Sequence, residues 1–169
     1  MHPPLDSPRL SSITAPARLA SIAVALQGAA VAGFASFQVS GAATWFRVAA
    51  AAHLAGAVVA GLAALPGALE WALTPPRLHR ARTVGLVHGL VVLAALACSA
   101  ANALATFPHR TEPPGDGLAV LLGCAAGWSL LVIGRWSGWT LASRHRVGLA
   151  VLVERAVRPR TAAASRRRR

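Results

Sequence analysis

The sequence predicts an all-α fold, an integral membrane bundle of four transmembrane helices, and three observations support this prediction. Hydrophobic residues make up 55% of the 169 residues and charged residues only 13%, and the mean hydropathy is +0.53, which is far from ordinary soluble composition. Four apolar segments each approach the roughly 20 residues that a helix needs to cross a bilayer. Proline and arginine concentrate outside these segments, where turns and loops are expected.

The first apolar segment follows a polar stretch, residues 1–18, that contains four prolines and two arginines. We expect this stretch to form an irregular N-terminal arm. Residues 19–39 are the first predicted span. Because this segment is longer than the about 7–15 apolar residues of a signal peptide, we expect a retained anchor rather than a cleaved signal.

The second and third predicted spans, residues 48–71 and 83–105, form the helical hairpin around which the chain is organised. A loop with Trp45 and Arg47 is expected before the second span. The turn TPPRLHRAR, with three arginines in nine residues, joins the two spans. Two apolar segments of this length joined by a short basic turn are typical of a membrane-spanning hairpin.

The fourth predicted span, residues 117–134, follows a loop of proline, glycine and acidic residues. Its continuation, residues 135–157, is basic and amphipathic, and we interpret it as a juxtamembrane extension. Residues 158–169 lack apolar periodicity and end in four arginines, which is typical of a disordered tail.

The distribution of arginine predicts the orientation of the chain. If the N-terminus lies inside, fifteen arginines fall on the cytoplasmic side and two, Arg47 and Arg110, fall outside. The positive-inside rule then places both termini in the cytoplasm. We expect the membrane to be the plasma membrane of a bacterium. The rule also accounts for the net charge of +12, so we expect membrane lipids as partners of the basic tail and no nucleic acid.

Small residues predict where helices approach one another closely. On an ideal helix they share one face of the second span and one face of the fourth, where two Gly-x-x-x-Gly spacings occur. These faces are candidate interfaces within the bundle, and they would also suit a homo-oligomer or a membrane complex. They consist of Ala52, Gly56, Ala60, Ala63 and Gly67 in the second span, and Gly123, Gly127, Gly134 and Gly138 in the fourth.

Polar side chains form a stripe on the third span, where lipid could not satisfy their hydrogen bonds. His88, Ser99, Asn102 and Thr106 fall within a narrow arc of that helix. Together with Glu70 near the end of the second span, they are expected to face the bundle interior. Two hypotheses follow: the stripe joins helices by hydrogen bonds, or it forms a site or a proton path.

Histidine suggests two cofactor hypotheses. His88 and His145 both fall on the cytoplasmic side, where they are candidate ligands of a haem or a metal; neutral, hydrogen-bonded histidines are the simpler alternative. His53 lies in the outer half, about 15 Å from His88 along the membrane normal, so the two cannot ligate one iron. His53, Cys98 and Cys124 share a similar depth that would suit a soft metal, but no short-range ligand spacing supports such a site.

Three stretches resemble the bacterial and archaeal membrane protein family catalogued as domain of unknown function 2231. They are GLAALPGALEW, which closes on Glu70; RARTVGLVHGL, with His88 one turn into the helix and Asn102 later; and SGWTLASRHRVGL, which contains Gly138, Leu141, His145, Val147, Gly148 and Leu149. The resemblance covers residues 56–149 and implies four spans and a membrane location, but no reaction. The first span departs from the family pattern, because the usual preceding His-Pro and the usual acidic residue are missing and Gln27 is the nearest polar substitute.

The sequence lacks a phosphate-binding loop, a nucleophile elbow and a His-Glu-x-x-His motif, so we expect no enzyme. The leading prediction is a non-enzymatic accessory or structural component of the membrane. One alternative is a redox subunit that holds haem or a metal at the cytoplasmic side through His88 and His145. Another is a small transporter or proton-conducting protein that uses Glu70, His88 and Asn102.

Overall fold

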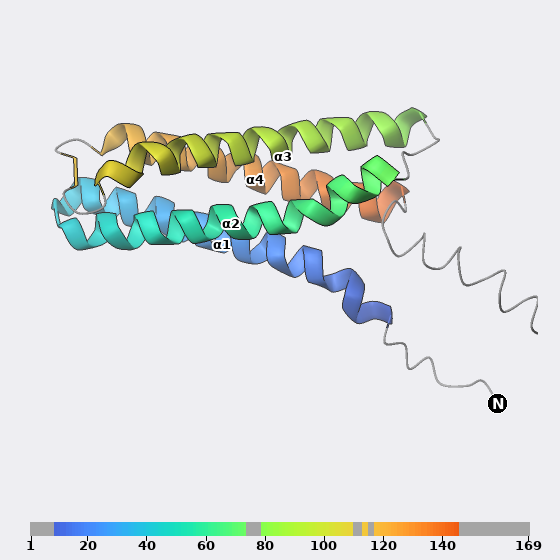
Figure 1. Ribbon diagram of the computed structural model, residues 1–169, viewed down its shortest axis with the longest axis horizontal. Coiled ribbons are helices and arrows are strands. Elements are labelled where there is room, and N and C mark those ends of the chain that lie inside the picture. Colours follow the sequence, from blue (N-terminus) through green and yellow to red (C-terminus); the bar gives the residue numbers. More distant parts are fainter. Residues whose placement is uncertain (1–8, 74–78, 110–112, 115–116, 146–169) are drawn as a thin grey trace, which may run out of the picture.

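The computed structural model describes residues 9–73, 79–109, 113–114 and 117–145. Within these residues the chain forms an up-down-up-down bundle of four long α-helices (Figure 1). The helices are α1 (Arg9–Ser40), α2 (Ala43–Leu73), α3 (His79–Thr106) and α4 (Leu118–His145), and a short 3-10 turn, η1 (Phe107–His109), ends α3.

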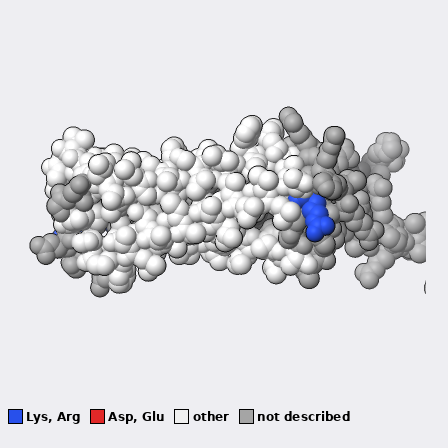
Figure 2. Space-filling view, turned by 90° about the horizontal axis from the view of Figure 1, so that it is seen from above, with Lys and Arg blue, Asp and Glu red and all other residues white. Residues whose placement is uncertain are grey.

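All four helices are long and apolar enough to cross a membrane, which confirms the predicted fold class. The candidate spans are Ala17–Ser40, Ala43–Leu69, Arg82–His109 and Leu118–Leu141. In the face drawn in Figure 2, no charged side chain appears along the middle of the bundle. Such a surface suits contact with lipid. The chain is therefore a multi-pass membrane protein.

The first helix begins ten residues earlier than the predicted span. The expected irregular arm is wrong for residues 9–18, which belong to α1. The helix continues through Pro16, and the arginine, leucine and alanine residues of this stretch are good helix formers that favour its extension beyond the apolar segment. The first turns of α1 lean away from the other three helices (Figure 1).

The loop expected around Trp45 and Arg47 is also wrong, because both residues belong to α2. Gly41 and Ala42 alone link the two helices. Gly41 adopts φ +67°, a left-handed conformation that glycine takes without steric cost, and its amide donates to the Phe37 carbonyl at 2.8 Å. This helix cap turns the chain within two residues and lets α2 begin at once.

The fourth helix continues past the predicted span to His145, so the first eleven residues of the expected juxtamembrane extension prolong α4. The rest of that extension and the predicted tail, residues 146–169, lie outside the described residues, as do residues 1–8.

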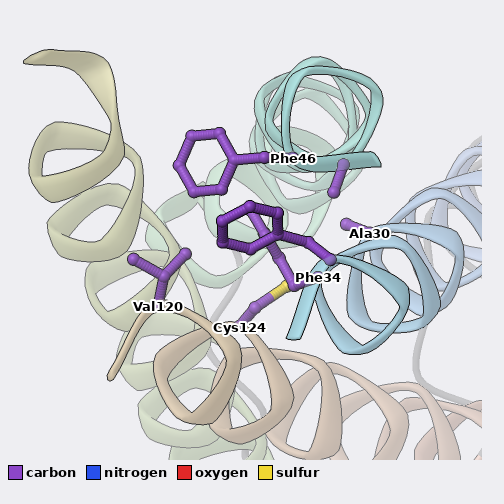
Figure 3. Packing of buried hydrophobic residues seen from close by; sticks show 7 residues of the cluster. Ala30, Phe34, Phe46, Val120 and Cys124 are labelled. Carbon is purple, nitrogen blue, oxygen red and sulfur yellow. The ribbon is translucent and has the colours of Figure 1, made fainter. Parts of the chain in front are cut away.

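Aromatic and small side chains fill one half of the bundle between α1, α2 and α4. Phe34 of α1 and Phe46 of α2 are buried and meet edge to face, with ring centroids 5.4 Å apart. Gly33 lies directly against α2: a Cβ at this position would be 2.9 Å from the Cβ of Ala49. The sulfur of Cys124 points toward Phe34 from α4 (Figure 3). Close approach of backbones and interlocked rings therefore hold these helices together.

The four glycines predicted to share one face of α4 all lie against α3. A Cβ added at each would meet a side chain of α3 within 2.6–3.1 Å. The pairs are Gly123 with Asn102, Gly127 with Ser99, Gly134 with Val92, and Gly138 with His88. This face is thus used within the bundle. The equivalent face of α2 is used only in part, because Gly56 contacts Gln27 whereas Gly67 has open space beside it.

Candidate functional site

Five buried residues, contributed by all four helices, meet inside the bundle, four through their side chains and Ser99 through its backbone oxygen. Each is at most 8% exposed. Because neither lipid nor bulk water reaches these groups, the hydrogen bonds that they make are to one another or to the backbone. They are Gln27 of α1, His53 of α2, Ser99 and Asn102 of α3, and Cys124 of α4. We call this set the His53 cluster.

The amide of Gln27 fixes one side of the His53 ring. Gln27 Nε2 donates to the backbone oxygen of His53 at 3.2 Å, which leaves Oε1 as the acceptor facing the ring. His53 Nδ1 lies 2.6 Å from this oxygen. An oxygen accepts and does not donate here, so Nδ1 carries a hydrogen. Two reciprocal bonds therefore join α1 to α2.

The other ring nitrogen of His53 faces α3. Nε2 lies 3.0 Å from the backbone oxygen of Ser99 and 3.5 Å from Nδ2 of Asn102. With Nδ1 protonated, the neutral ring has a bare Nε2 that accepts from Asn102. A single imidazole thus connects α1, α2 and α3. It donates to the Gln27 oxygen through Nδ1 and accepts from the Asn102 amide through Nε2.

The thiol of Cys124 closes the cluster from α4. Its sulfur is 3.4 Å from His53 Nδ1 and 3.8 Å from Gln27 Oε1, to which the S–H donates. Phe34 covers the ring at an angle of 65°. The cluster is therefore enclosed by sulfur and aromatic carbon as well as by amides.

Two glycines allow the helices to approach closely enough for these bonds. Gly56, one turn after His53, leaves room for Gln27, whose Cγ is 3.0 Å from the position a Cβ would take. Gly123, next to Cys124, does the same for Asn102, with Oδ1 at 2.6 Å from that position. A methyl group at either site would displace a member of the cluster.

The predicted soft-metal residues are only partly brought together. His53 and Cys124 are in contact, but the Cys98 thiol donates to the Gly123 carbonyl at 3.5 Å. Among the residues that the structure describes, no group of three histidine, cysteine or acidic side chains is placed to hold a metal ion.

The predicted polar stripe of α3 divides into separate environments. Ser99 and Asn102 belong to the His53 cluster, although Ser99 Oγ itself is buried with no hydrogen-bond partner. Thr106 is buried and donates to Ala103 in its own helix at 2.9 Å. The side chains of Glu70 and His145 lie outside the described residues.

His88 lies apart from the His53 cluster, against α4. Ser137 donates to the Gly134 carbonyl, so its oxygen accepts from His88 Nδ1 at 2.9 Å. The ring lies against Gly138, with Cε1 at 3.0 Å and Nε2 at 3.5 Å from the position a Cβ would take. This arrangement is that of a half-buried, hydrogen-bonded histidine packed between two helices.

Sequence reasoning missed the central role of His53 and did not include Gln27 or Cys124 in the predicted interior set. A signal was available, because each of the four spans has a polar or thiol side chain at a similar depth along the bundle. Matching these depths would have pointed to the cluster. Whether such groups meet depends on how each helix is rotated in the bundle. The sequence pattern of a single span does not predict this rotation.

The family model described as predicted membrane protein, domain of unknown function 2231, matches residues 16–151. The match includes the first span, which the sequence resemblance had left out. No curated protein and no solved structure matches the chain. Because the family model spans most of the sequence and agrees with four apolar helices, this chain belongs to the predicted membrane protein family DUF2231.

Proposed function

We propose that this chain is a non-enzymatic structural or accessory component of the bacterial cytoplasmic membrane, with both termini in the cytoplasm. The observation that carries the proposal is the His53 cluster. Its side chains bond between helices rather than around an empty site, and the imidazole alone contacts groups from α1, α3 and α4. The cytoplasmic termini rest on the distribution of arginine.

Hydrogen bonds of this kind suit a structural role because helices in lipid gain no hydrophobic stabilisation from packing together. Polar contacts between membrane helices contribute about 0.6 kcal/mol on average and about 1.7 kcal/mol at most. Several such contacts meet at His53, so their sum is a sizeable share of the stability of a small bundle.

Replacement of His53 tests the structural role. We expect His53→Leu in the full chain, reconstituted in lipid nanodiscs, to lower the unfolding temperature clearly. Leu54→Ala is the matched control, because Leu54 is the next residue along α2 and is 54% exposed on the outer surface. Equal stability of the two variants would contradict the proposal.

A proton-conducting protein is the second candidate, and the observation that favours it is a titratable imidazole at the centre of four spans. Vesicles with an enclosed pH-sensitive dye separate the two candidates. The structural proposal predicts that the full chain dissipates a pH gradient no faster than protein-free vesicles do. A proton flux through the full chain that His53→Leu abolishes would contradict the structural proposal and support proton conduction.

A further inference from the structure

We propose that His53 is a preformed proton-binding site inside the membrane-spanning bundle, at which Nε2 takes up a second ring proton and then donates a hydrogen bond to the backbone oxygen of Ser99. The inference goes beyond the structural role, because it assigns a ligand to the cluster. It does not depend on whether vesicles leak protons.

The starting point is that both nitrogens of the ring face oxygen acceptors. Nδ1 lies 2.6 Å from Gln27 Oε1 and Nε2 lies 3.0 Å from the Ser99 carbonyl. A neutral imidazole has one N–H and can satisfy one of these oxygens, whereas an imidazolium has two and can satisfy both. The cluster therefore has the acceptor geometry of the charged ring.

When the ring is neutral, Asn102 supplies a hydrogen-bond donor to the unprotonated nitrogen. With the hydrogen on Nδ1, the bare Nε2 accepts from Asn102 Nδ2 at 3.5 Å, although it also lies close to the Ser99 oxygen. A proton that arrives at Nε2 forms an N–H bond with the nitrogen lone pair. This N–H then donates to the Ser99 carbonyl without movement of the ring, and the bond from Asn102 is lost.

The groups that face His53 come from three helices. They are Gln27 and Phe34 of α1, Ser99 and Asn102 of α3, and Cys124 of α4. Of these five residues Cys124 has a titratable side chain, and none of the five carries a fixed charge. Each neighbour therefore acts on the protonation of His53 through its dipole rather than through a net charge, which makes the sign of its effect predictable.

Gln27 and Asn102 should act in opposite directions. The Gln27 oxygen accepts from the ring, and an acceptor stabilises the imidazolium more than the neutral ring. The Asn102 amide donates to bare Nε2, so it stabilises the neutral ring alone. Gln27→Leu should therefore lower the proton affinity of His53, and Asn102→Ala should raise it. Each change should be about two- to tenfold, as expected for one hydrogen bond.

Nitrogen NMR of the full chain in phospholipid nanodiscs, with ¹⁵N-labelled histidine rings, measures this directly. His53→Leu identifies the signals that belong to His53. At high pH we expect a neutral ring with hydrogen on Nδ1. On acidification we expect both ring nitrogens to become protonated reversibly, while circular dichroism shows that the helices are retained.

The variants complete the test. The midpoint pH of the His53 signal should fall in Gln27→Leu and rise in Asn102→Ala. It should rise more in Gln27→Glu than in Asn102→Ala, because glutamate has the shape of glutamine and adds a negative charge beside the ring. Ser129 is exposed and donates to the Ala125 carbonyl within α4, so Ser129→Ala should leave the midpoint pH unchanged.

Three results would overturn the proposal. One is a His53 ring that stays neutral at every pH at which the bundle is folded. Another is protonation that coincides with loss of helical signal, because a preformed site holds its proton in the folded state. The third is a shift of the same sign in Gln27→Leu and Asn102→Ala.

Discussion

A methyl group added at Gly33 should force α1 and α2 apart. The Cβ of Gly33→Ala would lie 2.9 Å from the Cβ of Ala49, 3.4 Å from its Cα and 3.5 Å from the Trp45 carbonyl oxygen. Carbon atoms pack best at about 3.5–4.0 Å, so the two helices must separate by about 0.5–1 Å. Neither partner can relieve the contact by rotating a side chain, because both methyl groups are attached directly to backbones.

The expected cost is that of overpacking, about 1–3 kcal/mol. Alanine is also the better helix former, by about 0.5–1 kcal/mol, and this gain offsets part of the cost. Gly61→Ala provides the matched control, since a Cβ at Gly61 would have nothing within 4 Å. The difference between the two variants isolates the helix–helix contact, because the gain in helix propensity is common to both.

Reversible unfolding of the full chain in mixed micelles, followed by circular dichroism, gives the two free energies of unfolding. We expect Gly33→Ala to be less stable than Gly61→Ala by about 1–3 kcal/mol. Equal stability of the two variants would refute the close approach of α1 and α2 at this point.

Three further predictions follow from the arrangement of the spans. A cysteine probe at Glu112 should react with an impermeant reagent added outside cells while one at Ala163 is spared; the reverse pattern would contradict cytoplasmic termini. Trp128 donates from Nε1 to the Val24 carbonyl at 3.1 Å, so Trp128→Phe should lower the free energy of unfolding by about 0.6–1.7 kcal/mol, and no loss would argue against the α1–α4 contact. A spin label in the tail, residues 155–169, should lose mobility with anionic lipid and regain it in high salt; mobility indifferent to both would exclude lipid contact.

The sequence alone was sufficient for the fold class because the signals for spans are strong and local. Apolar length identifies each span, and glycines at fixed spacing identified the face of α4 that contacts α3. The ends of the helices were less predictable. Hydropathy marks where apolar residues stop, whereas Gly41 and its cap decide where α1 stops. The helical turns beyond the apolar segments, such as those at Arg9 and Trp45, leave no trace in hydropathy.

The candidate site was predictable only within one helix. Ser99 and Asn102 share an arc of α3, and periodicity is enough to find such an arc. Their bonds to His53 depend on how α2 and α3 are rotated and shifted along one another. The same holds for Gln27, which lies 26 residues before His53 in the chain. Such pairings arise from packing in three dimensions, which no periodicity within a single span encodes.

The contact between Gln27 and His53 is the most direct point at which to test the role of the cluster. A double-mutant cycle compares the free energies of unfolding of the parent chain, Gln27→Leu, His53→Leu and the double variant. The side-chain bond at 2.6 Å predicts that the double variant is more stable than the sum of the single losses implies, by about 0.6–1.7 kcal/mol. The bond from Gln27 to the backbone oxygen of His53 can still form in His53→Leu, so it does not contribute to this coupling. Strictly additive losses would show that the two side chains do not interact, and would contradict a bundle joined through His53.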